Sequence, residues 1–286
     1  MKPVGSSRIA VLGLGLMGGS FAAALRGHCA SVIGMDRRGD AVRFALEHDL
    51  IDTGTTCVED ALPDVDITVL AAPVRAILDH INTYAQSWRP DSLVLDLGST
   101  KQEIARRMES LPDSVHAVGG HPMCGKELSG IHHADPAIYE QATFILTPLH
   151  RTTPEALATA EALVRVAGSV PLILDPARQD HLTATLSHLP YLLSCGLVAT
   201  ADAVTSSDPA AWEIVAGGFR DTSRIAGSDI DMMIDVLLTN RQEICSAVAA
   251  FQGRLGQLAQ SIAEEDESAL REVLTKIRTE RKRMFP

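Results

Sequence analysis

The sequence lacks the features that mark several classes of protein. Its five cysteines, at positions 29, 57, 124, 195 and 245, form no C-x-x-C pair and no metal-binding spacing. Scattered thiols in mostly apolar surroundings are typical of a reducing compartment. We expect no membrane-spanning segment, because no apolar run is long enough. We also expect no signal peptide, because the first predicted strand begins close to the N-terminus. These absences predict a cytoplasmic protein, and we expect no metal site in it.

Positive charge is scarce as well. The 286 residues include 25 lysines and arginines against 36 aspartates and glutamates, for a net charge of −11. This balance argues against a nucleic acid or an anionic membrane as the partner. An acidic protein that handles a small anion must concentrate positive charge in its site. The length suits two domains or one large one, and the apolar share of 46% is that of an ordinary soluble protein.

The segment from Arg8 to Asp36 predicts a strand, a glycine turn, a helix and a second strand. Residues 9–12 are apolar, as in a strand buried on both faces. Residues 13–18 read GLGLMG and match G-x-G-x-x-G, strong helix formers follow, and residues 31–35 form the second strand. The strand before the turn and the helix after it favour a dinucleotide site over an unliganded glycine turn.

Each part of this turn has a physical task. The first glycine allows a tight turn, the second lets the backbone approach a pyrophosphate, and the third lets the helix pack closely. Asp36 lies where a carboxylate hydrogen-bonds the ribose hydroxyls of NAD and repels the 2′-phosphate of NADP. Arg37 and Arg38 follow and soften that repulsion, so NAD is preferred and NADP is less favoured. The predicted cofactor-binding residues are Gly13, Leu14, Gly15, Leu16, Met17, Gly18, Asp36, Arg37, Ala71, Pro73 and Ser99.

Strands and helices alternate through the rest of the first 175 residues. We predict strands at 66–72, 93–97, 115–119, 144–147 and 170–174, and helices at 41–48, 74–86, 102–108 and 154–167. This order indicates right-handed βαβ units and a parallel sheet, with ligands beyond the carboxyl ends of the strands. The turns that hold Gly13, Pro73 and Ser99 should therefore line one rim. Residues 1–175 are predicted to form an α/β, Rossmann-like dinucleotide-binding domain.

Strand signals nearly vanish after residue 175. We predict helices at 177–203, 208–216, 230–260 and 264–283, which would pack as a bundle or against a second subunit. Residues 176–286 are thus predicted to form an all-α domain. The last helix begins with acidic residues and ends with basic ones, which matches the helix dipole better than a nucleic-acid site.

His121 is the first candidate for chemistry. It is predicted to follow a strand at the cofactor rim, next to two glycines and Pro122. A neutral imidazole with an ordinary pKa of about 6.5 suits a base that takes a hydroxyl proton as hydride leaves. The alternative is a structural histidine in a turn. Ser99 is a partner for this imidazole or for the cofactor, and its alternative role is to cap the helix that begins near Lys101.

Two further groups are candidates for substrate binding. Arg220 and Arg224 flank a glycine-rich bend at 217–224, which suggests a bidentate clamp for a carboxylate. A solvated turn with surface ion pairs is an equal alternative. His181 and His188 are seven residues apart on one predicted helix and should share a face. Two histidines alone do not make a zinc site.

Six motifs carry a resemblance to a known family: GLGLMGGS, AAPV, DLGSTK, GGHPMCGKELSG, SHLPY and GGFRDTSRIA. In this combination and order the sequence resembles the prephenate/arogenate dehydrogenases of tyrosine biosynthesis, across essentially the whole chain. The resemblance implies a Rossmann-like cofactor domain followed by a helical domain that builds a homodimer. It also implies oxidative decarboxylation of a small anionic cyclohexadienyl substrate, with no metal.

The resemblance also implies roles for residues. His121 would accept the proton of the ring hydroxyl, and Ser99 would orient it beside the nicotinamide. Arg224 would hold a substrate carboxylate, with support from Glu127, Asp180 and His188. Many relatives have a histidine where this chain has Tyr191, and Cys124 and Lys126 replace smaller neutral residues. Because Lys126 and Tyr191 lie where the substrate side chain is read, the choice between a keto and an amino substrate stays open.

Our leading hypothesis is an NAD-dependent prephenate dehydrogenase that also accepts arogenate. The alternatives are an NADP-linked arogenate dehydrogenase, a β-hydroxyacid dehydrogenase and a non-catalytic NAD-binding redox sensor. A β-hydroxyacid dehydrogenase would need a lysine base in its second domain, and residues 177–240 contain no lysine.

Overall fold

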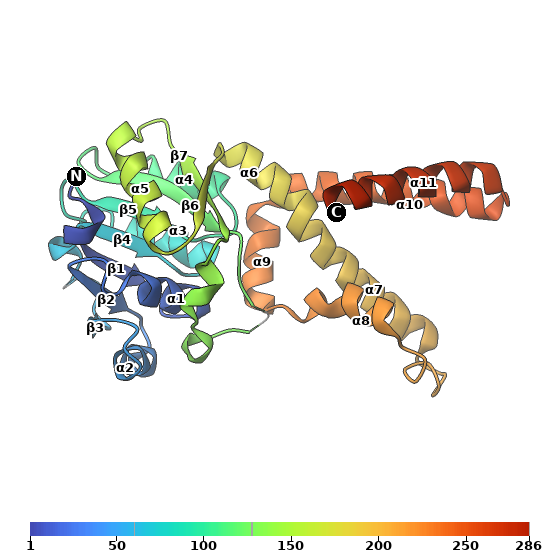
Figure 1. Ribbon diagram of the computed structural model, residues 1–286, viewed down its shortest axis with the longest axis horizontal. Helices are drawn as coiled ribbons and strands as arrows, with labels where there is room; N and C mark the ends of the chain where they lie inside the picture. Colours follow the sequence, from blue (N-terminus) through green and yellow to red (C-terminus); the bar gives the residue numbers. More distant parts are fainter. Residues whose placement is uncertain (60, 127, 286) are drawn as a thin grey trace. The chain divides into compact units, whose positions relative to one another are not determined.

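The computed structural model describes residues 1–59, 61–126 and 128–285 (Figure 1). The chain forms two compact units, Met1–Arg241 and Gln242–Pro286. The first unit holds the sheet, the helices that cover it and the first helices of the C-terminal half. The second unit holds most of α10 (Arg241–Ala263) and all of α11 (Glu267–Met284). The predicted domain boundary after residue 175 stays a prediction.

An eight-stranded sheet is the centre of the first unit. Its strands are β1 (Arg8–Leu12), β2 (Ser31–Met35), β3 (Thr53–Thr55), β4 (Ile67–Leu70), β5 (Leu93–Asp96), β6 (His116–Pro122), β7 (Thr143–Pro148) and β8 (Val170–Ile173). The order across the sheet is β3-β2-β1-β4-β5-β6-β7-β8. β6 and β7 are antiparallel, and the other six neighbouring pairs are parallel. The sheet is therefore mixed, whereas the alternation of strands and helices predicted a parallel one.

Alternation along the strands builds two apolar layers. In β1, Ile9 and Val11 face one side, and Ala10 and Leu12 face the other. The first side packs against α1 (Leu16–Leu25), α2 (Gly39–Glu47) and α5 (Pro154–Val166), and the second packs against α3 (Val74–Thr83) and α4 (Gln102–Met108). Figure 1 shows helices on both faces of the sheet. This is the layer architecture of doubly wound α/β proteins.

Helices dominate the chain after β8. They are α6 (Pro176–Thr183), a π-helical turn (Ala184–His188), α7 (Leu189–Thr205), α8 (Gly217–Ser223), α9 (Ile230–Thr239), α10 and α11. Carboxylates of Asp175, Asp229 and Asp266 accept hydrogen bonds from backbone N–H groups in the first turns of α6, α9 and α11. Such N-caps give each helix a defined start.

Two predicted helical segments differ from the structure. Residues 208–216 form turns, and the Asp208 carboxylate accepts a hydrogen bond from the Ala210 N–H, a local bond that competes with helix formation. Gly217–Ser223, predicted as a bend, forms α8, where the Thr222 carbonyl accepts a hydrogen bond from Ser194 of α7. The predicted helix 230–260 is interrupted at Asn240, between α9 and α10. Strand β3 was not predicted, because its three residues carry no apolar pattern.

The reason given for expecting no membrane-spanning segment, that no apolar run is long enough, does not hold. α6, the π-helical turn and α7 form a continuous helix of 30 residues, Pro176–Thr205, with an 18-residue window of mean hydropathy 1.3. Its length and composition would allow it to cross a bilayer, and 28% of that window is buried inside the protein. The same helix carries the buried polar residues Gln179, Asp180, Thr183 and His188. Buried polar side chains of this kind are typical of a helix that packs within a protein.

Candidate active site

The glycine turn has the geometry that its sequence predicted. Gly13 has a φ of +105°, and a Cβ there would overlap the carbonyl of Ala71. A Cβ at Gly18 would overlap the carbonyl of Gly13, whereas a Cβ at Gly15 would meet no atom within 4 Å. α1 begins directly after Gly15, which provides no side-chain cap for the first N–H groups. The turn thus leaves open space before a helix N-terminus, and it fits the pyrophosphate of a dinucleotide.

Asp36 is fixed beside this turn. Its Oδ2 accepts a hydrogen bond from the Leu14 N–H at 2.8 Å, and its Oδ1 accepts one from the Arg38 N–H at 2.9 Å. The Arg38 guanidinium lies 3.5 Å from the same carboxylate, and Arg37 is exposed. A negative charge therefore stands at the predicted ribose position, with one arginine already paired to it.

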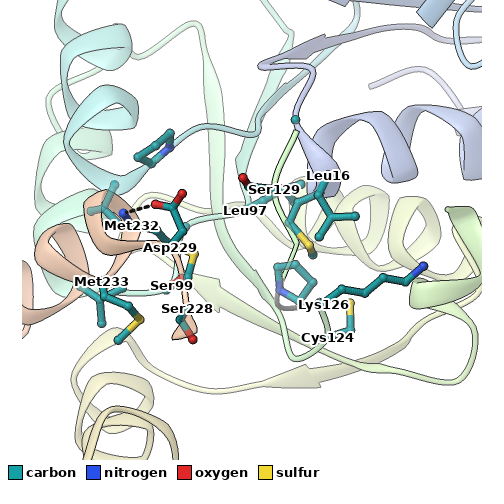
Figure 2. A pocket seen from close by; sticks show the side chains of 18 of the residues that line it. Leu16, Leu97, Ser99, Cys124, Lys126, Ser129, Ser228, Asp229, Met232 and Met233 are labelled. Carbon is teal, nitrogen blue, oxygen red and sulfur yellow. Dashed lines mark hydrogen bonds between the residues drawn. The ribbon is translucent and has the colours of Figure 1, made fainter. Parts of the chain in front are cut away.

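A cavity of about 810 Å³ lies next to the turn. Its walls include Gly15, Ala71, Ser99 and His121 from the sheet side and residues 227–229 from the helical segment before α9. Figure 2 shows Ser99, Asp229 and Met233 on one side, across from Leu16 and Lys126 on the other. The carboxyl ends of the strands therefore converge on one cavity, as the predicted topology requires, and its volume suits a small ligand.

His121 lies within β6 and pairs with Ile145 of β7, whereas the sequence placed it after the strand. Its side chain lines the cavity, is 9% exposed, and has an Nδ1 without a hydrogen-bond partner among the described residues. Burial, followed by the charges of Lys101 and His188, lowers the pKa of His121 to about 3 against an opposing interaction with Gln179. The pKa of His121 therefore lies well below the ordinary value of about 6.5. The imidazole is neutral over the whole physiological range.

Ser99 lines the cavity, but α4 is capped by another residue. The Asp180 carboxylate accepts hydrogen bonds from the N–H groups of Lys101 at 2.7 Å and Gln102 at 2.9 Å. Asp180 is fully buried, and burial raises its pKa against these bonds. The alternative role of Ser99 as a helix cap is therefore excluded, and the contacts of Asp180 are structural.

Buried polar groups link this cap to the cavity. The Asn240 amide donates to the Asp180 carbonyl at 2.8 Å and lies 3.4 Å from Nδ1 of His188. His188 lines the cavity, and burial lowers its pKa to about 4. His181 is exposed and is not among the residues that line the cavity, so only one of the two histidines reaches it. A π-helical turn, which is wider than an α-helical turn, occupies residues Ala184–His188 between them.

Lys126 brings positive charge to the cavity wall. Its ammonium forms an ion pair with Asp135 at 2.8 Å, and 37% of the side chain is exposed. Burial raises the pKa of the neighbouring Cys124 to about 11, so that this residue is a thiol. Glu127 lies outside the described residues.

Arg224 and Tyr191 lie outside the cavity walls that the described residues form. Arg224 is exposed at the start of the 3₁₀ helix Arg224–Gly227, which delivers Gly227 and Ser228 to the cavity. Tyr191 is half-buried on α7, and burial followed by its neighbour Cys195 raises its pKa. Their roles, like those of the other predicted site residues, stay predictions. The predicted residues that the cavity does bring together are Gly15, Leu16, Met17, Ala71, Pro73, Ser99, His121, Lys126 and His188.

Several side chains at this site were not predicted. Asp96 and Lys101 form a buried ion pair behind His121, and Gln179 donates to the Ser99 carbonyl at 3.3 Å. Met232 and Met233 line the cavity from α9. The signal for Asp96 and Lys101 was present, since an acid ends an apolar strand and a lysine follows within DLGSTK. No group of three metal-binding side chains occurs among the residues that the structure describes.

The mixed doubly wound sheet, the open glycine turn and the adjoining cavity define a dinucleotide-binding oxidoreductase. Two family models match the chain: "Prephenate dehydrogenase, nucleotide-binding domain" over residues 21–171 and "Prephenate dehydrogenase, dimerization domain" over residues 175–276. The chain therefore belongs to the prephenate dehydrogenase family, a family of NAD-dependent oxidoreductases. This finding confirms the predicted family and the predicted fold class, an α/β domain followed by a helical one.

Individual relatives agree with the family models. The prephenate dehydrogenase of Lactococcus lactis is 32% identical over 268 residues, which are 92% of this chain and 73% of that protein. The cyclohexadienyl dehydrogenase of Zymomonas mobilis is 29% identical over 263 residues, which are 90% of this chain and 89% of that protein. The crystal structure of the A. aeolicus prephenate dehydrogenase with hydroxyphenyl propionate and NAD+ matches with a TM-score of 0.90 and 31% identity. It covers 99% of this chain and 100% of that one.

Proposed function

We propose that the protein catalyses the NAD+-dependent oxidative decarboxylation of prephenate to 4-hydroxyphenylpyruvate in tyrosine biosynthesis. The observation that supports this most directly is that the Gly15 turn, Ser99 and His121 line the same cavity. A base beside a dinucleotide turn is the arrangement that oxidation of an alcohol needs. The NAD+ in the A. aeolicus relative supports NAD as the cofactor.

His121 would serve as the base. NAD+, when bound at the glycine turn, supplies the hydride acceptor. The imidazole takes the proton of the ring hydroxyl as the carbonyl forms, and Ser99 orients this hydroxyl. The bond to the ring carboxylate then breaks, CO2 leaves, and its electron pair makes the ring an aromatic phenolate. His121 returns the proton to the phenolate oxygen, so that no net proton is consumed.

The low pKa of His121 makes the substrate's charge important. Burial and Lys101 oppose a positive charge on the imidazole. A dianionic substrate in the same cavity would raise this pKa and make the transfer easier. Positive charge to hold the substrate would come from Lys126 at the cavity wall and from Arg224, which we propose grips a carboxylate. His188 lines the same wall, and Asp180 acts indirectly through the start of α4.

The substrate side chain and the cofactor are the two specificity choices. The ammonium of Lys126 favours a keto acid over a side chain with an ammonium of its own, and we propose prephenate over arogenate on this basis. Tyr191, together with Glu127, which follows Lys126 in the sequence, would complete this side-chain site. Arogenate stays a second candidate, because the Zymomonas mobilis relative is named for the wider class of cyclohexadienyl substrates. The fixed carboxylate of Asp36 favours NAD over NADP.

We also propose that the enzyme is a cytoplasmic homodimer. The match to a dimerisation-domain model supports this, as do exposed apolar side chains in the unit Gln242–Pro286. These include Leu255, Ile262, Leu274 and Ile277. Light scattering during size-exclusion chromatography should give twice the 30.6 kDa of the chain. A monomer at micromolar concentration would contradict the dimer.

The function is tested by following NAD(P)H formation with the four pairs of prephenate or arogenate and NAD+ or NADP+. We expect the highest kcat/KM with prephenate and NAD+, together with CO2 and 4-hydroxyphenylpyruvate as products. NAD+ binding without turnover of either substrate would support the redox-sensor alternative and contradict the enzyme. The highest rate with arogenate and NADP+ would support the second enzyme alternative.

A further inference from the structure

Asp96 and Lys101 form an ion pair in which both side chains are fully buried. Asp96 is the last residue of β5, and Lys101 occupies the N-cap position of α4. Neither residue is among those that line the cavity, and the proposed chemistry does not use them. Taking two charges out of water is costly, so a pair in this position calls for a reason.

The pair holds the backbone directly before His121. The Lys101 ammonium donates to the Gly120 carbonyl at 2.6 Å, and Oδ1 of Asp96 accepts from the Gly120 N–H at 3.0 Å. The ladder between β5 and β6 ends at Leu95 and Val118. Beyond that point, β5 no longer pairs with the backbone of β6. The side chains of Asp96 and Lys101 instead bond the N–H and the carbonyl of Gly120 and so fix the backbone of β6 up to His121.

Glycines leave the space that this arrangement requires. A Cβ at Gly120 would overlap the carbonyl of Asp96, and a Cβ at Gly98 would come within 2.9 Å of Oδ2 of Asp96. The Gly98 N–H also donates to this Oδ2 at 2.7 Å. A Cβ at Gly119 would lie 3.4 Å from the Lys101 side chain. The DLGSTK and GGHP motifs thus contact each other in the protein interior, through Asp96 and Lys101 of the first and Gly120 of the second.

We propose that Lys101 is a positioning residue for His121. Together with Asp96 it grips the N–H and the carbonyl of Gly120, and it thereby fixes the imidazole of the next residue at the cavity wall beside Ser99. This inference rests on the proposed function of His121 as the base.

The charges around His121 support this assignment. The carboxylate of Asp96 accepts three hydrogen bonds and the ammonium of Lys101 donates two, which is the pattern of an ionised pair. Burial lowers the pKa of Lys101 and raises that of Asp96, and their mutual attraction opposes both shifts. Burial is the main reason that the imidazole of His121 stays unprotonated, and the ammonium of Lys101 adds to this effect. Among the described residues, the other ionisable side chains that line the cavity with His121 are Cys124, Lys126, His188 and Asp229, and Asp180 lies on the same continuous helix as His188.

The main test is a double variant, Asp96→Asn with Lys101→Met. It removes both charges together, because a single loss of Lys101 would leave a buried carboxylate without its partner. The matched control is Lys2→Met with Asp66→Asn. It removes an ion pair at the amino end of β4, whereas Asp96 lies at the carboxyl end of the neighbouring strand β5. Circular dichroism and NAD+ titration establish that each variant is folded and binds its cofactor.

We expect the main variant to bind NAD+ as the wild type does, with kcat lower by about 10- to 100-fold and KM little changed. The acidic limb of its kcat/KM profile should move to higher pH, because the cation that opposes protonation of His121 is gone. The control should keep the wild-type kcat and profile. A folded main variant with wild-type kcat and an unmoved acidic limb would overturn the proposal. If the double variant does not fold, Lys101→Arg, which keeps the positive charge but moves the donor away from the Gly120 carbonyl, must lower kcat in the same way, and a wild-type kcat in that variant would overturn the proposal too.

A second measurement does not need turnover. In protein with isotope-labelled histidine, the His121 resonance is assigned by its loss in His121→Asn and is then followed with pH. We expect it to titrate at higher pH in the main variant than in the wild type. An unchanged titration would overturn the role of Lys101 even in an active enzyme. If the wild type shows no turnover with either cyclohexadienyl substrate, the proposed function fails, while this titration still decides whether Lys101 acts on His121.

Discussion

Two buried carboxylates at opposite ends of neighbouring strands, Asp66 directly before β4 and Asp96 at the end of β5, have different surroundings. Asp66 accepts from the Arg8 N–H at 2.9 Å and pairs with the half-exposed side chains of Lys2 and Arg89. Burial alone would raise its pKa, but these partners lower it overall. Asp96 has a single, fully buried cationic partner, and its pKa is raised.

The comparison separates two uses of buried charge. At the amino end, solvent reaches the partners, and the ion pairs tie the first residues of the chain to the sheet. At the carboxyl end, water is excluded and charge is used to hold backbone and to set the protonation of a neighbour. Ion pairs of the second kind contribute little net stability, since desolvation offsets the attraction. They are expected where geometry matters more than stability, as it does in an active site.

The largest effect should come from His121. His121→Asn should lower kcat by about 10²–10⁴-fold, the usual contribution of a general base, with little change in NAD+ binding. The matched control is His116→Asn, at the opposite end of the same strand, which should keep the wild-type kcat. Steady-state kinetics with prephenate and a fluorescence titration with NAD+ make the comparison. Equal kcat values for the two variants would contradict the role of His121 as the base.

Stability should fall in acid because of the histidines at the cavity. The folded-state pKa values of His121, about 3, and His188, about 4, lie below the unfolded value near 6.5. Between these values the unfolded state binds more protons, so this stability is present above pH 6.5 and is lost as the pH falls toward 4. The slope is about 1.4 kcal/mol per pH unit for each histidine.

Denaturant unfolding from pH 7 to pH 5 measures this slope. His188→Gln should flatten it by about one histidine's share relative to the wild type. Because the variant retains the buried carboxylates, their titration cancels in the comparison. A slope equal to that of the wild type would show that His188 is not held neutral by burial.

Local patterns were sufficient to predict the elements around the cofactor turn. β1, α1 and β2 follow from apolar runs and three glycines within 30 residues of one another, and the convergence of Ser99 and His121 follows from the strand order. Contacts between distant residues could not be predicted. Asp180 caps α4 from 79 positions away, and no local signal in either segment indicates this partner.

The surroundings of the charged residues and of the glycines could not be predicted from the sequence either. The DLGSTK motif contains Asp96 and Lys101, but only the fold reveals that they pair with each other and that Lys101 donates to the Gly120 carbonyl. Gly217 and Gly218 predicted a bend, but packing against α7 stabilises α8 there despite its low helix propensity. Tertiary contacts decided each of these cases.

Loss of the Asp180 cap should have an intermediate effect. Asp180→Ala leaves the N–H groups of Lys101 and Gln102 without their acceptor, and we expect a loss of about 1–3 kcal/mol in the free energy of unfolding. kcat should fall as well, since α4 carries Lys101 into its place behind His121. Asp175→Ala, which removes the cap of α6 at the surface, is the control and should cost about 1 kcal/mol with an unchanged kcat. If Asp180→Ala lost stability without any change in kcat, the capping of α4 by Asp180 would not affect the position of His121.

The smallest effect belongs to the amino end of the sheet. Lys2→Met removes a half-exposed partner of Asp66, which keeps Arg89 and the Arg8 N–H. We expect a change of less than about 1 kcal/mol in the free energy of unfolding, reduced further at high salt, and no change in kcat. Unfolding in urea at low and high salt measures it. A loss of several kcal/mol would mean that the amino-end pair is held as tightly as Asp96 and Lys101, and that solvent access does not separate the two kinds of buried charge.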